Sequence, residues 1–267
     1  FKLTRTWIGA SLLAAAFLTH LALALYRTAQ RRVWQMPMWE IVQIATGLAI
    51  PLLLIDHVLA TRGAHVWYGA QDYYRPVLLH YWPVRAVPQL LLVLVAWTHA
   101  CIGLHYWLRL APWYGRFAPV LLSAAVLLPA LALAGFLVAA RDLLAALSPE
   151  DIAALRKAAA WPQDRGALEA ASVYGVVGYL TLLAGVGVVH ALRRGFGRGR
   201  RQIQVRYTSG PEIKAPAGAT LLEMSRMRGV PHASVCGGRA RCSTCRVRVE
   251  EGGHALPLPE FAEAVTL

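Results

Sequence analysis

One stretch decides the fold of the C-terminal part of this chain: Val235-Cys236-Gly237-Gly238-Arg239-Ala240-Arg241-Cys242-Ser243-Thr244-Cys245. It holds three of the four cysteines, with five residues between the first pair and two between the second. Thiolates at such spacings can converge on one metal centre, and iron–sulfur clusters are held by cysteine thiolates. The two glycines let the backbone amides turn toward a bound sulfide. The stretch therefore predicts an iron–sulfur site with Cys236, Cys242 and Cys245 as ligands.

The residues around this loop resemble a [2Fe–2S] ferredoxin of the adrenodoxin-like and bacterial type. Residues 202–208 alternate as a strand, and residues 212–215 can pair back as a second strand. A capped helix is expected over residues 220–228. After the cysteine loop, residues 246–250 form a third predicted strand. This order is that of a β-grasp domain, an α+β fold that we expect over residues 203–267.

The ligand set of this loop is incomplete in the sequence. A ferredoxin has a fourth, distant cluster cysteine, and no cysteine follows Cys245. We therefore expect the ferredoxin-like domain to be partial and the chain to be a fragment of a longer protein. A zinc site is the alternative, because His232 or His254 would complete a Cys3His set.

The composition indicates a membrane protein with a small soluble part. At 267 residues and 57% hydrophobic content the chain is too apolar for an ordinary soluble domain, and its charged residues concentrate after Arg193. The net charge of +13 does not indicate nucleic acid, since the arginines gather at the ends of apolar segments, as membrane topology requires. The composition shift predicts a transmembrane domain at 1–195, a linker at 196–202 and the ferredoxin-like domain at 203–267.

Five apolar segments reach the roughly 20 residues that cross a bilayer. They cover residues 7–26, 38–60, 87–108, 118–140 and 168–192. Arginine-rich first and third loops and the tail are assigned to the cytoplasm, and the more acidic second and fourth loops to the outside. Residues 148–160 predict a short interfacial helix. The fold class is thus an all-α membrane helical bundle of five spans, with a sixth expected before Phe1, followed by the partial ferredoxin-like domain.

Several histidines lie within or at the ends of the predicted spans. Ionisable groups at membrane depth are costly and usually functional, and imidazole is a common axial ligand of haem iron. At about 1.5 Å per residue, His20 and His99 lie at matching depths, which makes them the predicted ligands of an inner b-type haem. His105 is the alternative to His99, and His57 is the predicted ligand of an outer haem. Hydrogen bonding between helices is the other interpretation of each histidine.

Four elements of the sequence resemble bacterial class III adenylate/guanylate cyclases that carry a cytochrome b-like, dihaem, six-helix anchor and a [2Fe–2S] ferredoxin domain. They are Met36-Pro37-Met38-Trp39-Glu40, Gly47-Leu48-Ala49-Ile50-Pro51-Leu52-Leu53-Leu54, the segment from Trp97 through His99 and His105 to Trp107, and the cysteine motif. The resemblance implies two haems, a response to the quinone pool, a homodimer and a bacterial inner membrane with the ferredoxin domain in the cytoplasm. This chain lacks the family's first anchor helix, the fourth cluster cysteine and the cyclase domain.

Together these patterns predict a redox- and quinone-sensing membrane anchor, with haem b and a [2Fe–2S] cluster, that regulates a nucleotide cyclase making cAMP from ATP. Enzyme activity would belong to the parent protein, because this chain has no catalytic domain. The alternative is a quinol-linked electron-transfer subunit of a membrane oxidoreductase. A further alternative is a membrane protein with a zinc-binding tail.

Overall fold

The computed structural model describes residues 6–31, 34, 36–162, 165–196, 202–208, 210–259 and 261–265. The chain forms two compact units, one of Pro37–Tyr179 and one of Phe1–Met36 together with Leu180–Leu267. Most of the predicted linker, residues 196–202, lies outside the described residues. The division into a transmembrane domain, a linker and a ferredoxin-like domain stays a prediction.

Five long apolar helices among the described residues confirm the predicted all-α membrane bundle. They are α1 (Trp7–Gln30), α2 (Met38–Val58), α5 (Ala86–Leu108), α6 (Tyr114–Ala146) and α8 (Gly166–Phe196). Each is long and apolar enough to cross a bilayer. Large apolar side chains such as Leu12 of α1 and Leu131 of α6 are exposed over most of their surface, as lipid-facing side chains are. The chain is therefore a multi-pass membrane protein.

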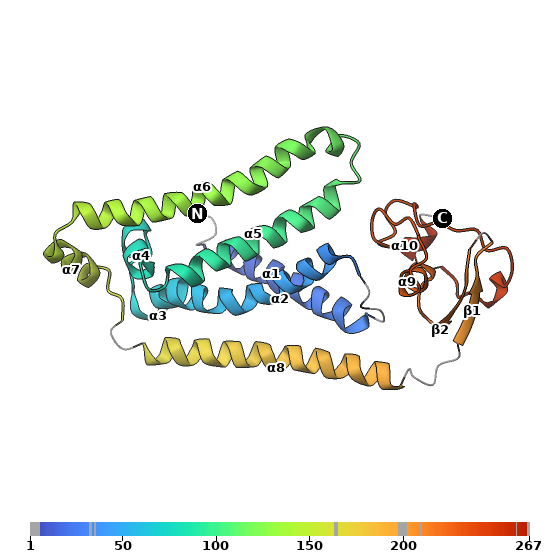
Figure 1. Ribbon diagram of the computed structural model, residues 1–267. Helices are drawn as coiled ribbons and strands as arrows, with labels where there is room; N and C mark the ends of the chain where they lie inside the picture. The colour runs from blue at the N-terminus through green and yellow to red at the C-terminus, as the bar shows by residue number, and fades with distance from the viewer. Residues whose placement is uncertain are drawn as a thin grey trace. The chain divides into compact units, whose positions relative to one another are not determined.

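Helices α2 and α5 pack side by side (Figure 1). The imidazole of His99 on α5 lies against Gly47 on α2, so closely that a Cβ atom at Gly47 would be 2.7 Å from His99 Cε1. In the same way, a Cβ atom at Gly103 on α5 would be 3.2 Å from the side-chain nitrogen of Gln43. Small residues let membrane helices approach and exchange polar contacts. These two glycines therefore set the spacing of the α2–α5 pair.

Helix α8 packs onto α2 through its first half. The Tyr179 hydroxyl donates a hydrogen bond of 3.0 Å to the backbone carbonyl of Leu48. Gly175 lies against Ile55, whose Cγ2 would be 3.0 Å from an added Cβ. Helix α2 therefore contacts both α5 and the first half of α8.

Two loop regions meet at one end of this unit. The first runs from a π-helical segment (Leu59–Gly63) through α3 (Ala64–Tyr68) to α4 (Tyr74–Tyr81), and the second contains α7 (Pro149–Ala158). The backbone N–H of Gln71 donates to the Ala159 carbonyl at 2.8 Å, and α4 lies beside α7 (Figure 1). The second and fourth loops thus share one end, as the predicted topology requires. The short helix predicted over residues 148–160 is α7, and Ser148 caps it in a capping box.

The other unit contains α1, the end of α8 and the small C-terminal domain. Thr6 caps α1 by accepting a hydrogen bond of 3.1 Å from the Gly9 N–H. The indole N–H of Trp34, which follows α1, donates to His190 Nε2 of α8 at 2.9 Å. His190 is therefore a hydrogen-bonding residue between the ends of two helices.

The C-terminal domain begins with an antiparallel pair of strands, as predicted. Its elements are β1 (Gln202–Arg206), β2 (Glu212–Pro216), α9 (Leu221–Met227), a 3-10 turn (Gly253–Ala255) and α10 (Phe261–Ala264). Alternating burial along β2 directs Ile213 and Ala215 onto Met224 of α9, which forms the core. Thr220 caps α9 in a capping box with Glu223. This small core positions the cysteine loop that follows α9.

The third strand predicted over residues 246–250 is wrong. These residues have no regular secondary structure and form no ladder with any described strand, and Val247 and Val249 remain 43% exposed. Alternation of apolar and polar residues favours a strand only where a neighbouring strand pairs with it and one face is buried. Among the described residues, β1 and β2 do not pair with this segment and do not bury one of its faces.

We predict that Gly47→Ala weakens the bundle by about 1–3 kcal/mol, because the new methyl group overpacks the contact with His99. The measurement is the thermal unfolding of the purified chain in nanodiscs. Gly135→Ala on α6 is the matched control, because its Cβ would meet no atom within 4 Å and alanine favours a helix over glycine. Equal melting temperatures for the two variants would contradict the close contact.

Candidate functional site

The cysteine loop curls tightly against α9. Its backbone turns at Gly237 (φ 72°), Gly238 (φ 81°), Ala240 (φ 51°) and Ser243 (φ 50°). Gly238 has a second reason to be glycine, since a Cβ there would be 2.8 Å from the Leu222 side chain of α9. Positive φ angles at successive positions bend a chain sharply. The path of the loop therefore depends on these turns and on the close contact between Gly238 and Leu222 of α9.

The sulfur atoms in this loop have polar neighbours. Cys236 is buried, and Cys242 and Cys245 are partly buried. The backbone N–H of Cys236 donates to Cys242 Sγ at 3.3 Å, and Thr244 Oγ1 lies 3.0 Å from the same sulfur. The hydrogen bond with Thr244 lowers the pKa of Cys242 to about 7. Burial raises the pKa of Cys245, and the nearby Cys236 raises it further.

The donor chemistry of this loop fits an iron–sulfur cluster. All three cysteines are free thiols, and hydrogen bonds to sulfur are among the contacts that tune such clusters. In the part of the chain that the structure describes, no three His, Cys, Asp or Glu side chains are arranged as a metal-binding set. The loop would therefore have to close further around iron to bring Cys236, Cys242 and Cys245 together.

His232 links α9 to the cysteine loop. Its Nδ1 lies 2.8 Å from the hydroxyl of Ser225, a fully buried residue of α9. Its Nε2–H donates to the Cys245 carbonyl, 3.1 Å away. Both ring nitrogens of His232 thus have hydrogen-bond partners in this structure, and the alternative Cys3His zinc site stays a prediction. His254 is exposed in the 3-10 turn.

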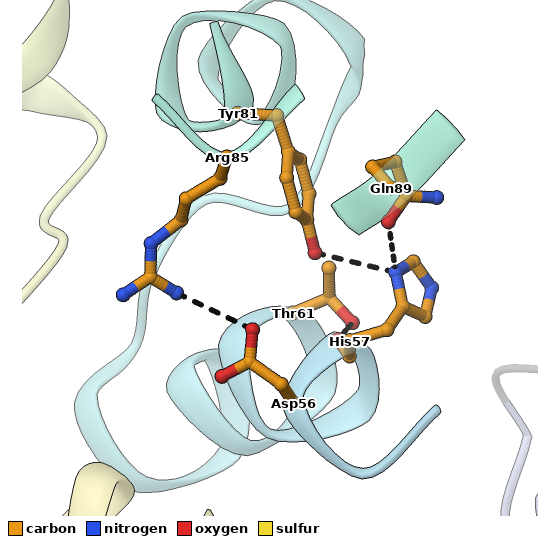
Figure 2. A network of polar contacts seen from close by, with 6 residues as sticks. All are labelled: Asp56, His57, Thr61, Tyr81, Arg85 and Gln89. Carbon is orange, nitrogen blue, oxygen red and sulfur yellow. Dashed lines mark hydrogen bonds and ion pairs between the residues drawn. The ribbon is translucent and has the colours of Figure 1, made fainter. Parts of the chain in front are cut away.

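His57 lies in a network of polar contacts at the end of α2 (Figure 2). Its Nδ1 is 2.7 Å from Gln89 Oε1 and 3.2 Å from the Tyr81 hydroxyl. The neighbouring residue, Asp56, pairs with Arg85 at 3.7 Å. A π-helical segment follows directly, and such segments are frequent at functional sites. His57 is thus held at a polar corner between α2, α4 and α5.

His99 occupies a second level of the same helix pair. Its Nδ1 is 3.1 Å from the backbone carbonyl of Gln43 and 3.3 Å from Thr46 Oγ1. Its Nε2 is 3.5 Å from the Gln43 side-chain nitrogen. Ten residues separate His57 from Gly47 on α2, and ten separate Gln89 from His99 on α5. At 1.5 Å per residue the two imidazole levels are about 15 Å apart along the helices.

The other two predicted haem ligands lie on other parts of the bundle. His105, near the end of α5, has its Nδ1 2.6 Å from the Tyr114 hydroxyl at the start of α6. His20 is an exposed residue of α1, and α1 belongs to the other compact unit. The pairing of His20 with His99 therefore stays a prediction, as does the choice between His99 and His105.

Tyr81, Arg85 and Gln89 were not selected from the sequence, although a signal existed. They are spaced four residues apart, and the spacing places three polar side chains on one face of a helix-like turn. The tryptophan–histidine pair near them was also missed. The rings of His80 and Trp161 stack at 3.9 Å beside a cavity of about 200 Å³.

Comparison with known proteins supports the C-terminal assignment. Residues 207–264 match the family model of the 2Fe-2S iron-sulfur cluster binding domain. No curated protein matches the chain significantly, and no solved structure does. The chain therefore combines a multi-pass membrane bundle with a C-terminal ferredoxin-type domain whose family supports a [2Fe–2S] cluster. This combination defines a membrane protein of redox type.

We predict that His232→Ala weakens iron retention by the cysteine loop, because it removes the link between Ser225 and the Cys245 carbonyl. Bound iron per chain is measured after reconstitution with iron and sulfide, followed by a chelator challenge. His254→Ala is the matched control and should leave retention unchanged. If His254→Ala lowers the bound iron instead, His254 is a metal ligand and the proposed ligand set is wrong.

The half-buried imidazole of His80 makes the stability of the bundle depend on pH. Burial, with help from Arg165 and Arg85, lowers the pKa of His80 from 6.5 to about 4. Between these two values the unfolded chain binds a proton that the folded chain does not, so stability is complete above pH 6.5 and falls toward pH 4.

The expected result is a melting temperature in nanodiscs that declines over this window for the native chain. His80→Phe retains the ring that stacks on Trp161 but cannot titrate, so its decline should be shallower. Parallel pH profiles for the two proteins would show that His80 does not contribute.

Proposed function

We propose that this chain is the redox-sensing membrane module of a larger signalling protein. Its bundle would hold b-type haem between membrane helices and exchange electrons with the quinone pool. Its C-terminal domain would hold a [2Fe–2S] cluster in the cytoplasm of a bacterium. The redox state of the module would set the activity of a nucleotide cyclase that makes cAMP from ATP. As in the family it resembles, the working form would be a homodimer in the inner membrane.

The observation that carries this proposal is the coexistence of two features in one chain. The C-terminal part matches a [2Fe–2S] domain, and the α2–α5 pair carries imidazoles at two levels. Placing an imidazole inside a membrane bundle costs free energy unless the ring forms hydrogen bonds or binds a ligand. In a membrane protein with an iron–sulfur domain, a haem within the bilayer would be a second redox group that can exchange electrons with the first.

The imidazoles of α2 and α5 fit a haem ligand in their hydrogen bonding. A carbonyl oxygen lies near Nδ1 of both His57 and His99, which favours the tautomer whose Nε2 can bind a metal. His57 and His99 would hold haem iron, with His20 or His105 as further ligands. The group would supply one-electron chemistry when bound, and the helices would orient it and exclude water.

In the cluster site, Cys236, Cys242 and Cys245 would be three of the four ligands. The Cys236 N–H would donate to sulfur, as it already does to Cys242 Sγ. The Thr244 hydroxyl, 3.0 Å from the same sulfur, would donate as well. Such hydrogen bonds stabilise the more negative, reduced state of a cluster. Arg226, held by a hydrogen bond of 3.1 Å to Ser234, opposes the rise in the Cys245 pKa and would stabilise thiolate there.

The direct test is spectroscopic. The chain reconstituted in nanodiscs with haem, iron and sulfide should show Soret and α bands on dithionite reduction and a rhombic [2Fe–2S] signal in electron paramagnetic resonance. His57→Ala and His99→Ala should each lower bound haem, whereas His65→Ala, in the loop region, should not. Cys236→Ser should remove the cluster signal. A native chain with neither spectrum would refute the proposal.

A quinol-linked electron-transfer subunit of an oxidoreductase is the second candidate, favoured by the same match to an iron–sulfur domain. The coding sequence downstream of this chain separates the two. A cyclase domain there supports signalling, whereas a flavin- or nicotinamide-binding domain supports electron transfer. Metal analysis that finds zinc and no iron in the purified chain would select the third candidate, a membrane protein with a zinc-binding tail.

A further inference from the structure

Three side chains form one face of the corner that joins α4 to α5. Tyr81, Arg85 and Gln89 are linked by backbone hydrogen bonds of the helical type, from Arg85 N–H to the Tyr81 carbonyl at 2.9 Å and from Gln89 N–H to the Arg85 carbonyl at 3.4 Å. All three are directed toward the end of α2, as Figure 2 shows. Arg85 meets Asp56, and the other two meet His57. The face formed by these three side chains therefore contacts two consecutive residues of α2, Asp56 and His57.

The hydrogen bond between Gln89 and His57 decides the tautomer of the imidazole. The atom facing His57 Nδ1 is the amide oxygen of Gln89, at 2.7 Å. An amide oxygen only accepts hydrogen bonds, so this orientation of the Gln89 side chain places the proton on Nδ1. The Tyr81 oxygen, at 3.2 Å, is a second acceptor for the same N–H.

The opposite nitrogen of His57 then carries a lone pair. A neutral imidazole has one proton, and with that proton on Nδ1 the Nε2 atom is a free base. Figure 2 shows this nitrogen turned away from Tyr81 and Arg85. The ring borders a small cavity of about 90 Å³, whose lining combines apolar residues with the polar residues of this corner: Leu52, Leu53, Pro88, Asp56, Tyr81, Arg85 and Gln89. A histidine near the end of a membrane-spanning helix is a candidate functional residue.

The backbone around His57 is held as firmly as its ring. Thr61, in the π-helical segment, donates through Oγ1 to the His57 carbonyl at 2.7 Å. The ion pair between Asp56 and Arg85, with nitrogen and oxygen 3.7 Å apart, joins the neighbouring residue of α2 to the same corner. Tyr81 itself is 4% exposed, so its hydroxyl is anchored by the packing of α4. The imidazole is therefore oriented before any ligand arrives.

We propose that Gln89 and Tyr81 are positioning residues that fix His57 in the Nδ1–H tautomer and present its Nε2 lone pair to a haem iron. The inference rests on the proposed function for the identity of the metal group, but the tautomer itself follows from the hydrogen bonds alone. A hydrogen bond on the far nitrogen of a ligating histidine fixes its orientation and raises its basicity, and its loss typically costs 10–100-fold in metal affinity.

His99 provides an internal comparison. It has the same tautomer, because its Nδ1 faces the backbone carbonyl of Gln43 at 3.1 Å. Its Nε2, however, lies 3.5 Å from the side-chain nitrogen of Gln43, which would have to move before a metal could bind. His57 is therefore the imidazole that is prepared for a ligand. The positioning group for His57 is a side chain, which can be replaced without changing the backbone.

The first experiment needs no haem. The full chain, labelled with ¹⁵N-histidine and held in nanodiscs, gives ¹⁵N shifts that distinguish protonated from unprotonated ring nitrogens. The His57 signals are assigned by their loss in His57→Ala. We expect protonated Nδ1 and bare Nε2 in the native chain, and a mixture of tautomers in Gln89→Leu. Protonated Nε2 in the native chain, or an unchanged spectrum in Gln89→Leu, would overturn the inference.

The second experiment measures haem titrated into the same nanodiscs. Gln89→Leu should weaken binding at the His57 site about 10–100-fold, and Tyr81→Phe by less, since Tyr81 is the longer contact. Gln89→Glu should retain binding and lower the midpoint potential, because a carboxylate makes the imidazole more basic. The exposed Gln71→Leu is the matched control and should leave both quantities unchanged.

The two experiments separate failure of this inference from failure of the proposed function. If the native chain binds no haem but shows the expected tautomer shift, the haem proposal fails and the positioning role of Gln89 stands. If the native chain binds haem and every Gln89 variant binds it with unchanged affinity and potential, the positioning role fails. Loss of folding in Gln89→Leu would appear as a changed melting temperature, and Gln89→Glu then decides through the potential.

Discussion

Polar atoms inside a membrane bundle must find their partners within the chain, and this constraint organises the contact between α2 and α5. The imidazole of His99 reaches the backbone carbonyl of Gln43 because Gly47 leaves room for the ring. One level away, His57 reaches Gln89 on the opposite helix. Each helix thus supplies a histidine to the other. The groups that hold the pair together are therefore the same groups that would give it a function.

In the C-terminal domain, a much smaller hydrophobic core positions the cysteine loop. Its two strands and α9 bury only a few apolar side chains, and the cysteine loop depends on them for its position. The contact between Gly238 and Leu222 and the bridge from Ser225 through His232 to Cys245 both run from α9 to the loop. The loop has little regular structure of its own. Its sulfur atoms are therefore placed by the packing of a neighbouring helix.

The polar corner at the end of α2 shows how a short-range pattern becomes a site only in three dimensions. The spacing of Tyr81, Arg85 and Gln89 is visible in the sequence, but proline and tryptophan residues between them obscure the helical repeat. The structure continues helical hydrogen bonds across this corner and so aligns the three side chains. The predicted strand at 246–250 illustrates the reverse case, since its alternation is clear yet no described strand pairs with it.

The sequence by itself determined the five spans, the capped helices α7 and α9, the β1–β2 pair and the cysteine loop. These features depend on local composition, capping and hydrophobic periodicity, which act over a few residues. Tertiary structure alone decided that His99 packs on Gly47, that Gln89 and Tyr81 face His57, and that His232 has both nitrogens occupied. Those contacts join residues distant in the chain, and their geometry depends on how closely two helices approach, a quantity that no local pattern encodes.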